Sequence, residues 1–123
     1  KLGGPAMNGL YASMAAQHPY LDEASQPLRF WANKYKTKFN EDPTVFSAYG
    51  YVIMDLFIRA AQKAGPGLNT DSFVKSMDTM TVPPDIFGTP EQKFTPTKHL
   101  GSDASRLSQL QDGKWKVVSD YFK

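Results

Sequence analysis

Cysteine is absent from this chain of 123 residues. Disulfide bonds and metal sites built from thiolates are therefore excluded, whereas the compartment stays open because many exported proteins also lack cysteine. Long apolar runs are missing as well, and no stretch approaches the roughly 20 apolar residues that a membrane-spanning helix requires. The length suits one compact unit at most.

An excess of charge of one sign is also missing. The chain holds 14 Lys and Arg residues against 12 Asp and Glu residues, a formal net charge of +2, and the basic residues are scattered. The densest cluster, Lys34, Lys36 and Lys38, alternates with other residues on an expected helix and fits a solvated face better than a phosphate-binding stripe. We therefore expect no nucleic-acid partner.

Motifs for metal, cofactor and nucleotide chemistry are missing too. His18 and His99, the two histidines, lie far apart, and neither belongs to an HExxH-like helical pair that presents ligands to zinc. The nine glycines form neither a GxGxxG fingerprint nor a P-loop. The sequence therefore predicts no metal site and no cofactor.

A hydrolytic site has little support in the sequence. Ser102, His99 and Asp103 supply the residue types of a catalytic triad, but no strand-turn-helix elbow of the kind that exposes a nucleophilic serine surrounds Ser102. Asp22 and Glu23 are adjacent carboxylates at an expected helix end, where solvation or contact with backbone amides explains them. We therefore expect a non-enzyme and keep a small hydrolase only as a third alternative.

The strongest pattern that is present spans residues 46–65, FSAYGYVIMDLFIRAAQKAG. Its apolar residues recur at steps of three and four, which predicts a helix with one buried stripe. Thr44 is expected to cap the first turn, and Gly65 is expected to end the helix in a left-handed conformation. The expected stripe consists of Phe46, Tyr49, Ile53, Leu56, Phe57, Ala60 and Ala64.

Two segments before this helix carry weaker signals. Residues 9–16, GLYASMAA, alternate in a way typical of a short strand, with a helix as the rival interpretation. Residues 23–39 repeat apolar positions at helical spacing, and Asn40 and Pro43 stop that pattern. Asp22 and Ser25 are the candidate caps of this helix.

The segment after the central helix begins with a shorter helix and then changes character. Asn69 or Thr70 is expected to cap the helix. Four prolines and two glycines between Val82 and Gly101 then predict extended and turning backbone. The side chains expected to be buried by the short helix are Phe73, Val74, Met77 and Met80.

A terminal β-hairpin is predicted from residues 105–111 and 114–121. Asp112 and Gly113 lie between them, and this dipeptide suits a two-residue turn because both residues adopt positive φ angles easily. The tight register places Leu110 opposite Trp115 and Leu107 opposite Val118. One strand, three helices and a hairpin make an α/β set whose very small sheet needs cover from elsewhere.

Five segments resemble, in the same order, the late third of the branched-chain amino-acid type of solute-binding protein of ABC transporters, the type I periplasmic binding proteins. The central one holds KYKTKFNEDP and FSAYGYVIMDLFIRAAQKAG, the first begins GLY, the fourth contains HLGS, and the last reads QLQDGKWKVVSDY. No one of these motifs is specific, but five in register over most of the chain are. The segments are residues 9–13, 30–65, 70–80, 94–102 and 109–121.

The resemblance implies a fold and a division of the chain. The fold class is α/β, the C-terminal fragment of a two-lobed type I periplasmic binding protein fold that closes on a small solute. Residues 1–81 would supply a crossover strand and helices of the first lobe. Residues 82–123 would supply a crossover and the terminal hairpin of the second lobe, so the chain is one fragment and not two independent domains.

The resemblance also implies where a solute and the hinges lie. Residues 82–87 would form one hinge strand, and a second would contain Tyr11, Ala12 and Ser13. The expected solute contacts, at the start of the central helix, are Ser47, Ala48 and Tyr49. Core packing is the competing interpretation of Tyr49. Ala48 occupies a position where some members of the family have a polar or cationic contact, which permits an aromatic or other organic acid in place of an amino acid.

The implied function is that of an extracytoplasmic, periplasmic solute-binding component of an ABC importer for amino acids or related small organic acids. Its partners would be the small-molecule solute and a membrane permease. The alternative is a ligand-sensing domain of a receptor built on the same fold. Because the missing cover would leave apolar surface exposed, we expect the fragment to self-associate.

Overall fold

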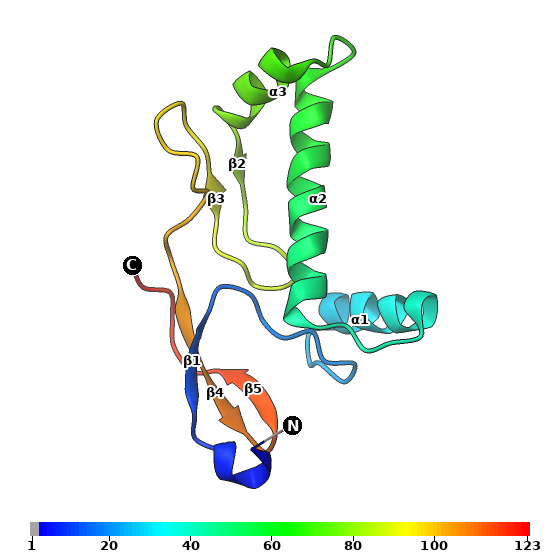
Figure 1. Cartoon of the computed structure of the whole chain (residues 1–123), viewed down its shortest axis with the longest axis vertical. Coiled ribbons are helices and arrows are strands. Elements are labelled where there is room, and N and C mark those ends of the chain that lie inside the picture. Colours follow the sequence, from blue (N-terminus) through cyan, green and yellow to red (C-terminus); the bar gives the residue numbers. More distant parts are fainter. Residues whose placement is uncertain (1–2) are drawn as a thin grey trace.

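The computed structural model describes residues 3–123, and Figure 1 shows their arrangement. Three helices and a short β-ladder lie toward one end of the molecule, and a three-stranded sheet lies toward the other. In chain order the elements are η1 (Gly4–Met7), β1 (Tyr11–Met14), α1 (Gln26–Phe39), α2 (Val45–Ala64), α3 (Thr70–Met77), β2 (Thr81–Val82), β3 (Gln92–Lys93), β4 (Arg106–Gln111) and β5 (Lys114–Val117).

Helix α2 confirms the central helix that the sequence predicts. The Thr44 hydroxyl accepts a hydrogen bond from the Phe46 N–H at 3.2 Å, and the Ser47 hydroxyl accepts one from the Thr44 N–H at 3.1 Å. These reciprocal bonds satisfy N–H groups that have no partner inside the helix. Gly65 ends the helix as expected, but its φ of 75° and ψ of −164° differ from the left-handed conformation predicted for it.

The buried stripe expected on α2 is wrong for three of its seven residues. Ala60 is fully buried as predicted and Tyr49, Leu56 and Ala64 are partly buried, but Phe46 is 78% exposed, Ile53 64% and Phe57 49%. The two fully buried residues of the helix are small, Ala48 and Ala60. Periodicity identified an apolar helix, but this helix is apolar on more than one side, so periodicity could not say which side the chain itself covers.

Helices α1 and α3 form where they were expected, but in each helix the burial of one apolar residue differs from the prediction. Helix α1 starts at Gln26, three residues later than predicted, because Pro27 suits a first turn and Ser25 occupies the N-cap position. Asn40 ends it in the left-handed region with φ of 55°. Each helix also exposes one apolar residue expected to be buried, Phe39 in α1 and Val74 in α3.

The sheet has the antiparallel order β1-β4-β5 and confirms both the short strand and the hairpin. Asp112 and Gly113 have φ of 52° and 76°, the conformation of a type I′ turn. Leu110 pairs with Trp115 as predicted, and the Val118 N–H donates to the Leu107 carbonyl at 2.9 Å, which continues the same register. Strand β1 is therefore a strand and not a helix.

Residues 82–87, expected as a hinge strand, are a strand only at Val82. Pro83 and Pro84 have no N–H to donate to a ladder, so the strand stops there. The Asp85 carboxylate then accepts hydrogen bonds from the N–H groups of Phe87 at 2.9 Å and Thr89 at 3.2 Å, which favours a turn over an extended strand. The β2–β3 ladder that precedes and follows this turn was not predicted.

Two small cores hold the helical part together. One contains Ala16, Leu28, Ala48 and Phe87 at the start of α2, and the other contains Ala60, Met80 and Val82 near its end. Thus β2 and β3 pack with the helices, whereas β1 pairs with β4. The elements of residues 1–81 and of residues 82–123 are shared between these two groups, and the division into lobes at residue 82 stays a prediction.

Candidate functional site

The first turn of α2 carries the three residues expected at a solute. Ser47 is partly exposed, and because its oxygen accepts the Thr44 N–H, its own O–H remains able to donate. Tyr49 is partly buried against the first core, and its ring centroid lies 6.2 Å from that of Phe46. Ala48 is fully buried, so in this arrangement it supports the turn from behind and its expected contact with a solute stays a prediction.

This turn meets two segments, the passage after β1 that leads from the sheet to the helices and the turn between β2 and β3. Ala16, which follows β1, and Phe87, which follows β2, share a core with Ala48. The Gln17 N–H donates to the Phe87 carbonyl at 2.8 Å, so the two segments are also joined through their backbones. The structure therefore brings the expected solute-contact turn next to the passage after β1 and the β2–β3 turn.

The expected hinge residues lie in the sheet, just before the passage that contains Ala16. Tyr11, Ala12 and Ser13 pair with β4 opposite Gln109, Ser108 and Leu107, inside the sheet. The chain leaves the sheet only after Met14, so the passage itself is formed by residues 15–17. Bending during a lobe movement would concentrate in residues without ladder hydrogen bonds, and the hinge role of residues 11–13 stays a prediction.

Tyr121, near the end of the chain, is bonded to both the passage after β1 and the β2–β3 turn. The sequence did not suggest this role. Its hydroxyl donates to the Ala15 carbonyl at 3.1 Å and also contacts the Gly88 carbonyl. Burial raises the pKa of this phenol, which keeps its proton available for donation. The Arg106 guanidinium lies over the Tyr121 ring at 4.8 Å.

Gly88 is required at this junction for two reasons. Its φ of +64° lies in the left-handed region, and a Cβ atom there would lie 2.5 Å from Nη2 of Arg106. Among the described residues, that same nitrogen is a buried side-chain atom without a hydrogen-bond partner. We call the set of residues 15–17, Phe87, Gly88, Arg106 and Tyr121 the junction. A glycine placed between Pro84 and Pro90 was the signal in the sequence that could have drawn attention to it.

A groove of about 350 Å³ runs between α2 and residues 82–89. Tyr51 and Phe87 give it an aromatic end, and Asp55 and Arg59 pair at 2.6 Å on its α2 side. Ser47, Ala48 and Tyr49 do not line it. The groove and the expected solute contacts are therefore neighbours on α2 but separate surfaces.

The residues of the hydrolase alternative are not arranged as a triad. Nε2 of His99 lies 3.3 Å from Asp78, whereas Asp103 pairs with Lys98 at 3.3 Å and the Ser102 hydroxyl accepts the Ala104 N–H at 3.1 Å. Each residue thus has another partner, and no serine–histidine hydrogen bond links them in the described chain. The geometry gives no support to hydrolysis.

Two further kinds of site are not found among residues 3–123. No three His, Asp or Glu side chains gather in a way that could hold a metal ion. None of the described helices combines the length and the hydropathy needed to cross a bilayer.

Comparison with known proteins places the fold. A family model described as periplasmic binding protein matches residues 1–114, whereas no curated protein matches the chain. A branched-chain amino acid ABC transporter from Thermus thermophilus with bound valine is 18% identical with a TM-score of 0.74, over 98% of this chain and 35% of that one.

Two other solved structures with a similar fold are named for different ligands. A solute-binding protein from R. palustris in complex with benzoate is 15% identical, with a TM-score of 0.68, over 95% of this chain and 31% of that one. A fatty acid ABC transporter substrate-binding protein from Thermomonospora curvata is 17% identical, with a TM-score of 0.74, over 98% and 33%. The chain spans about a third of each structure's length, and it belongs to the periplasmic binding protein family.

Proposed function

We propose that this chain is the C-terminal part of the extracytoplasmic solute-binding component of an ABC importer, and that it acts by binding and not by catalysis. The observation that carries the proposal is the meeting of the first turn of α2 with the passage after β1, at Ala16, and with the β2–β3 turn, at Phe87. A solute held at this turn would lie next to a passage through which one lobe moves against the other. Binding energy there couples directly to lobe closure.

The solute class that we propose is a small carboxylate, an amino acid or a related organic acid. Valine and benzoate, the ligands named for two similar structures, and the fatty acid named for a third share a carboxylate group. The free O–H of Ser47 and the ring of Tyr49 would contribute one donor and one apolar wall. Ala48 would set the depth of that wall, because a larger side chain would displace Leu28 or Phe87 behind it.

Calorimetric titration of the full-length protein with small carboxylates tests the proposal. We expect one of valine, benzoate or a fatty acid to bind, and Ser47→Ala to weaken that binding about threefold to tenfold, the effect of one lost hydrogen bond. Ser72→Ala is the matched control, since Ser72 also accepts the N-cap N–H of its own helix, at 2.9 Å in α3. Equal affinity in both variants would remove Ser47 from the site, and no heat with any carboxylate would contradict the solute class.

We further propose that residues 1–123, produced alone, self-associate through α2. The large side chains of this helix that the described chain leaves uncovered include Phe46, Ile53, Met54, Phe57 and Ile58, each about half exposed or more. In a protein three times as long, such a face has other elements to cover it; in the separate chain a second copy is the available apolar partner. We also propose that the full-length protein lies in the periplasm and docks on a membrane permease.

A further inference from the structure

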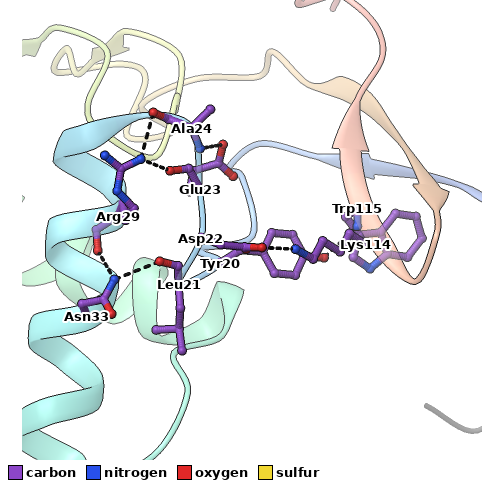
Figure 2. Close-up of polar contacts among 9 residues, drawn as sticks. All are labelled: Tyr20, Leu21, Asp22, Glu23, Ala24, Arg29, Asn33, Lys114 and Trp115. Carbon is purple, nitrogen blue, oxygen red and sulfur yellow. Dashed lines mark hydrogen bonds and ion pairs between the residues drawn. The ribbon is translucent and has the colours of Figure 1, made fainter.

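Residues 18–24, which connect the passage after β1 to α1, make polar contacts in two directions (Figure 2). We infer that this segment, the strap, ties the terminal hairpin to α1 and limits how far the sheet can swing away from the helices. The inference rests on the proposed solute-binding function only for its purpose, because the contacts themselves need no solute.

On one side the strap is bonded to α1 by side chains of that helix. Nδ2 of Asn33 donates to the Leu21 carbonyl at 2.9 Å, and Nη1 of Arg29 donates to the carbonyls of Glu23 at 2.6 Å and Ala24 at 3.3 Å. Three backbone carbonyls of a loop are thereby fixed to one helix face. The strap moves with α1.

On the other side the strap is bonded to the start of β5. The Trp115 N–H donates to the Tyr20 hydroxyl at 2.7 Å, and Nζ of Lys114 lies 2.5 Å from Oδ2 of Asp22 and 5.4 Å from the centroid of the Tyr20 ring. β5 is an edge strand, so its outward N–H groups have no neighbouring strand to bond. Tyr20 supplies the missing acceptor for one of them.

The two contacts at β5 are unequal in strength. Asp22 and Lys114 are exposed, with side chains 70% and 45% accessible, and such an ion pair contributes little because water and salt screen it. The bond between Tyr20 and Trp115 is partly buried, and burial raises the pKa of the phenol, which therefore stays neutral. Tyr20 is thus the main fastening, and Asp22 orients Lys114 over its ring.

The place of the strap gives it a mechanical consequence. The described helices and the three-stranded sheet share no extensive packing of their own. Besides the chain segments that link them, residues 15–25 and 94–105, they are connected through the junction around Phe87, Gly88 and Tyr121. A second set of contacts at the far end of the hairpin restrains rotation about the junction. Opening of the two parts therefore requires the strap to release β5 or to bend.

Amide hydrogen exchange measured by NMR tests the fastening without any solute. In Tyr20→Phe the Trp115 amide should exchange about threefold to tenfold faster, since one hydrogen bond is lost, while the amides of β1 and β4 keep their rates. Tyr35→Phe is the matched control, because the Tyr35 hydroxyl donates to Glu41 at 2.9 Å outside the hairpin. An unchanged Trp115 rate in Tyr20→Phe would overturn the inference.

Small-angle scattering of the encoded polypeptide tests the restraint. The double variant Tyr20→Phe with Asp22→Asn should give a larger radius of gyration without solute, and Tyr35→Phe with Asp42→Asn should not, because Asp42 pairs with Lys36 at 2.5 Å away from the hairpin. Faster Trp115 exchange with no change in radius would overturn the strap as a restraint. Absent solute binding with both effects present would count against the proposed function alone.

Discussion

The three-stranded sheet and the helical part acquire their structure in different ways. In the sheet, the turn at Asp112 and Gly113 aligns Leu110 with Trp115, and the whole hairpin follows from residues close together in sequence. In the helical part, local caps fix where α2 begins and ends, but several of its large apolar side chains are about half exposed or more in the described chain. Local signals therefore define the bounds of an element, and its complete set of neighbours defines which face is buried.

The largest expected effect comes from a large apolar side chain that is fully buried at the junction. Phe87 is fully buried and lies in the junction, so Phe87→Ala should lower the free energy of unfolding by about 3–5 kcal/mol. Phe46→Ala, on the exposed side of α2, should change it by less than about 0.5 kcal/mol. Urea titration of both variants measures the contrast, and similar losses would show that the exposed face of α2 is covered in solution.

The second prediction concerns Gly88, which holds the junction between the two parts. Gly88→Ala should cost about 1–2 kcal/mol because an L-residue is disfavoured at this φ, with further cost from the contact with Arg106. Gly67→Ala is the control, since no atom lies within 4 Å of a Cβ built there. If thermal unfolding shifts equally in both variants, the junction does not need a glycine.

The third prediction concerns the uncovered face of α2. Replacing Phe46 and Ile53 by lysine should leave the free energy of unfolding of the separate chain within about 1 kcal/mol and should reduce its self-association. Sedimentation velocity over a range of concentrations reports the association. A monomer at all concentrations before any substitution would show that this face needs no partner, and the contrast with the sheet would disappear.

The smallest expected effect is the pH dependence of the strap. Lys114 lowers the pKa of Asp22 by its hydrogen bond and charge, so this carboxyl contributes stability above its unfolded pKa and loses the contribution as pH falls through its folded pKa. Tyr20 and Glu23 are the other titratable groups near Lys114. Unfolding of Asp22→Asn between neutral and acidic pH should therefore show a slightly weaker pH dependence, and an identical slope would indicate that the pair contributes nothing.

Sequence patterns predicted the bounds of the helices and the hairpin register because caps and turns act over a few residues. They failed for the stripe on α2, since Phe46, Ile53 and Phe57 are apolar whether or not the chain covers them. The β2–β3 ladder was missed because two-residue strands carry no period. The bonds of Tyr20 and Tyr121 to residues 95 and 106 positions away leave no local trace in the sequence.

The two tryptophans of the chain lie at two of the places where the helical part contacts the sheet. The Trp31 ring lies edge-on to Phe87, with centroids 4.8 Å apart, at the junction, and Trp115 lies at the end of the strap. Indole emission shifts to longer wavelength when water reaches the ring. The protein thus carries one tryptophan at each of these contacts. Replacing either tryptophan by phenylalanine would let the fluorescence of the other report the opening of its own contact.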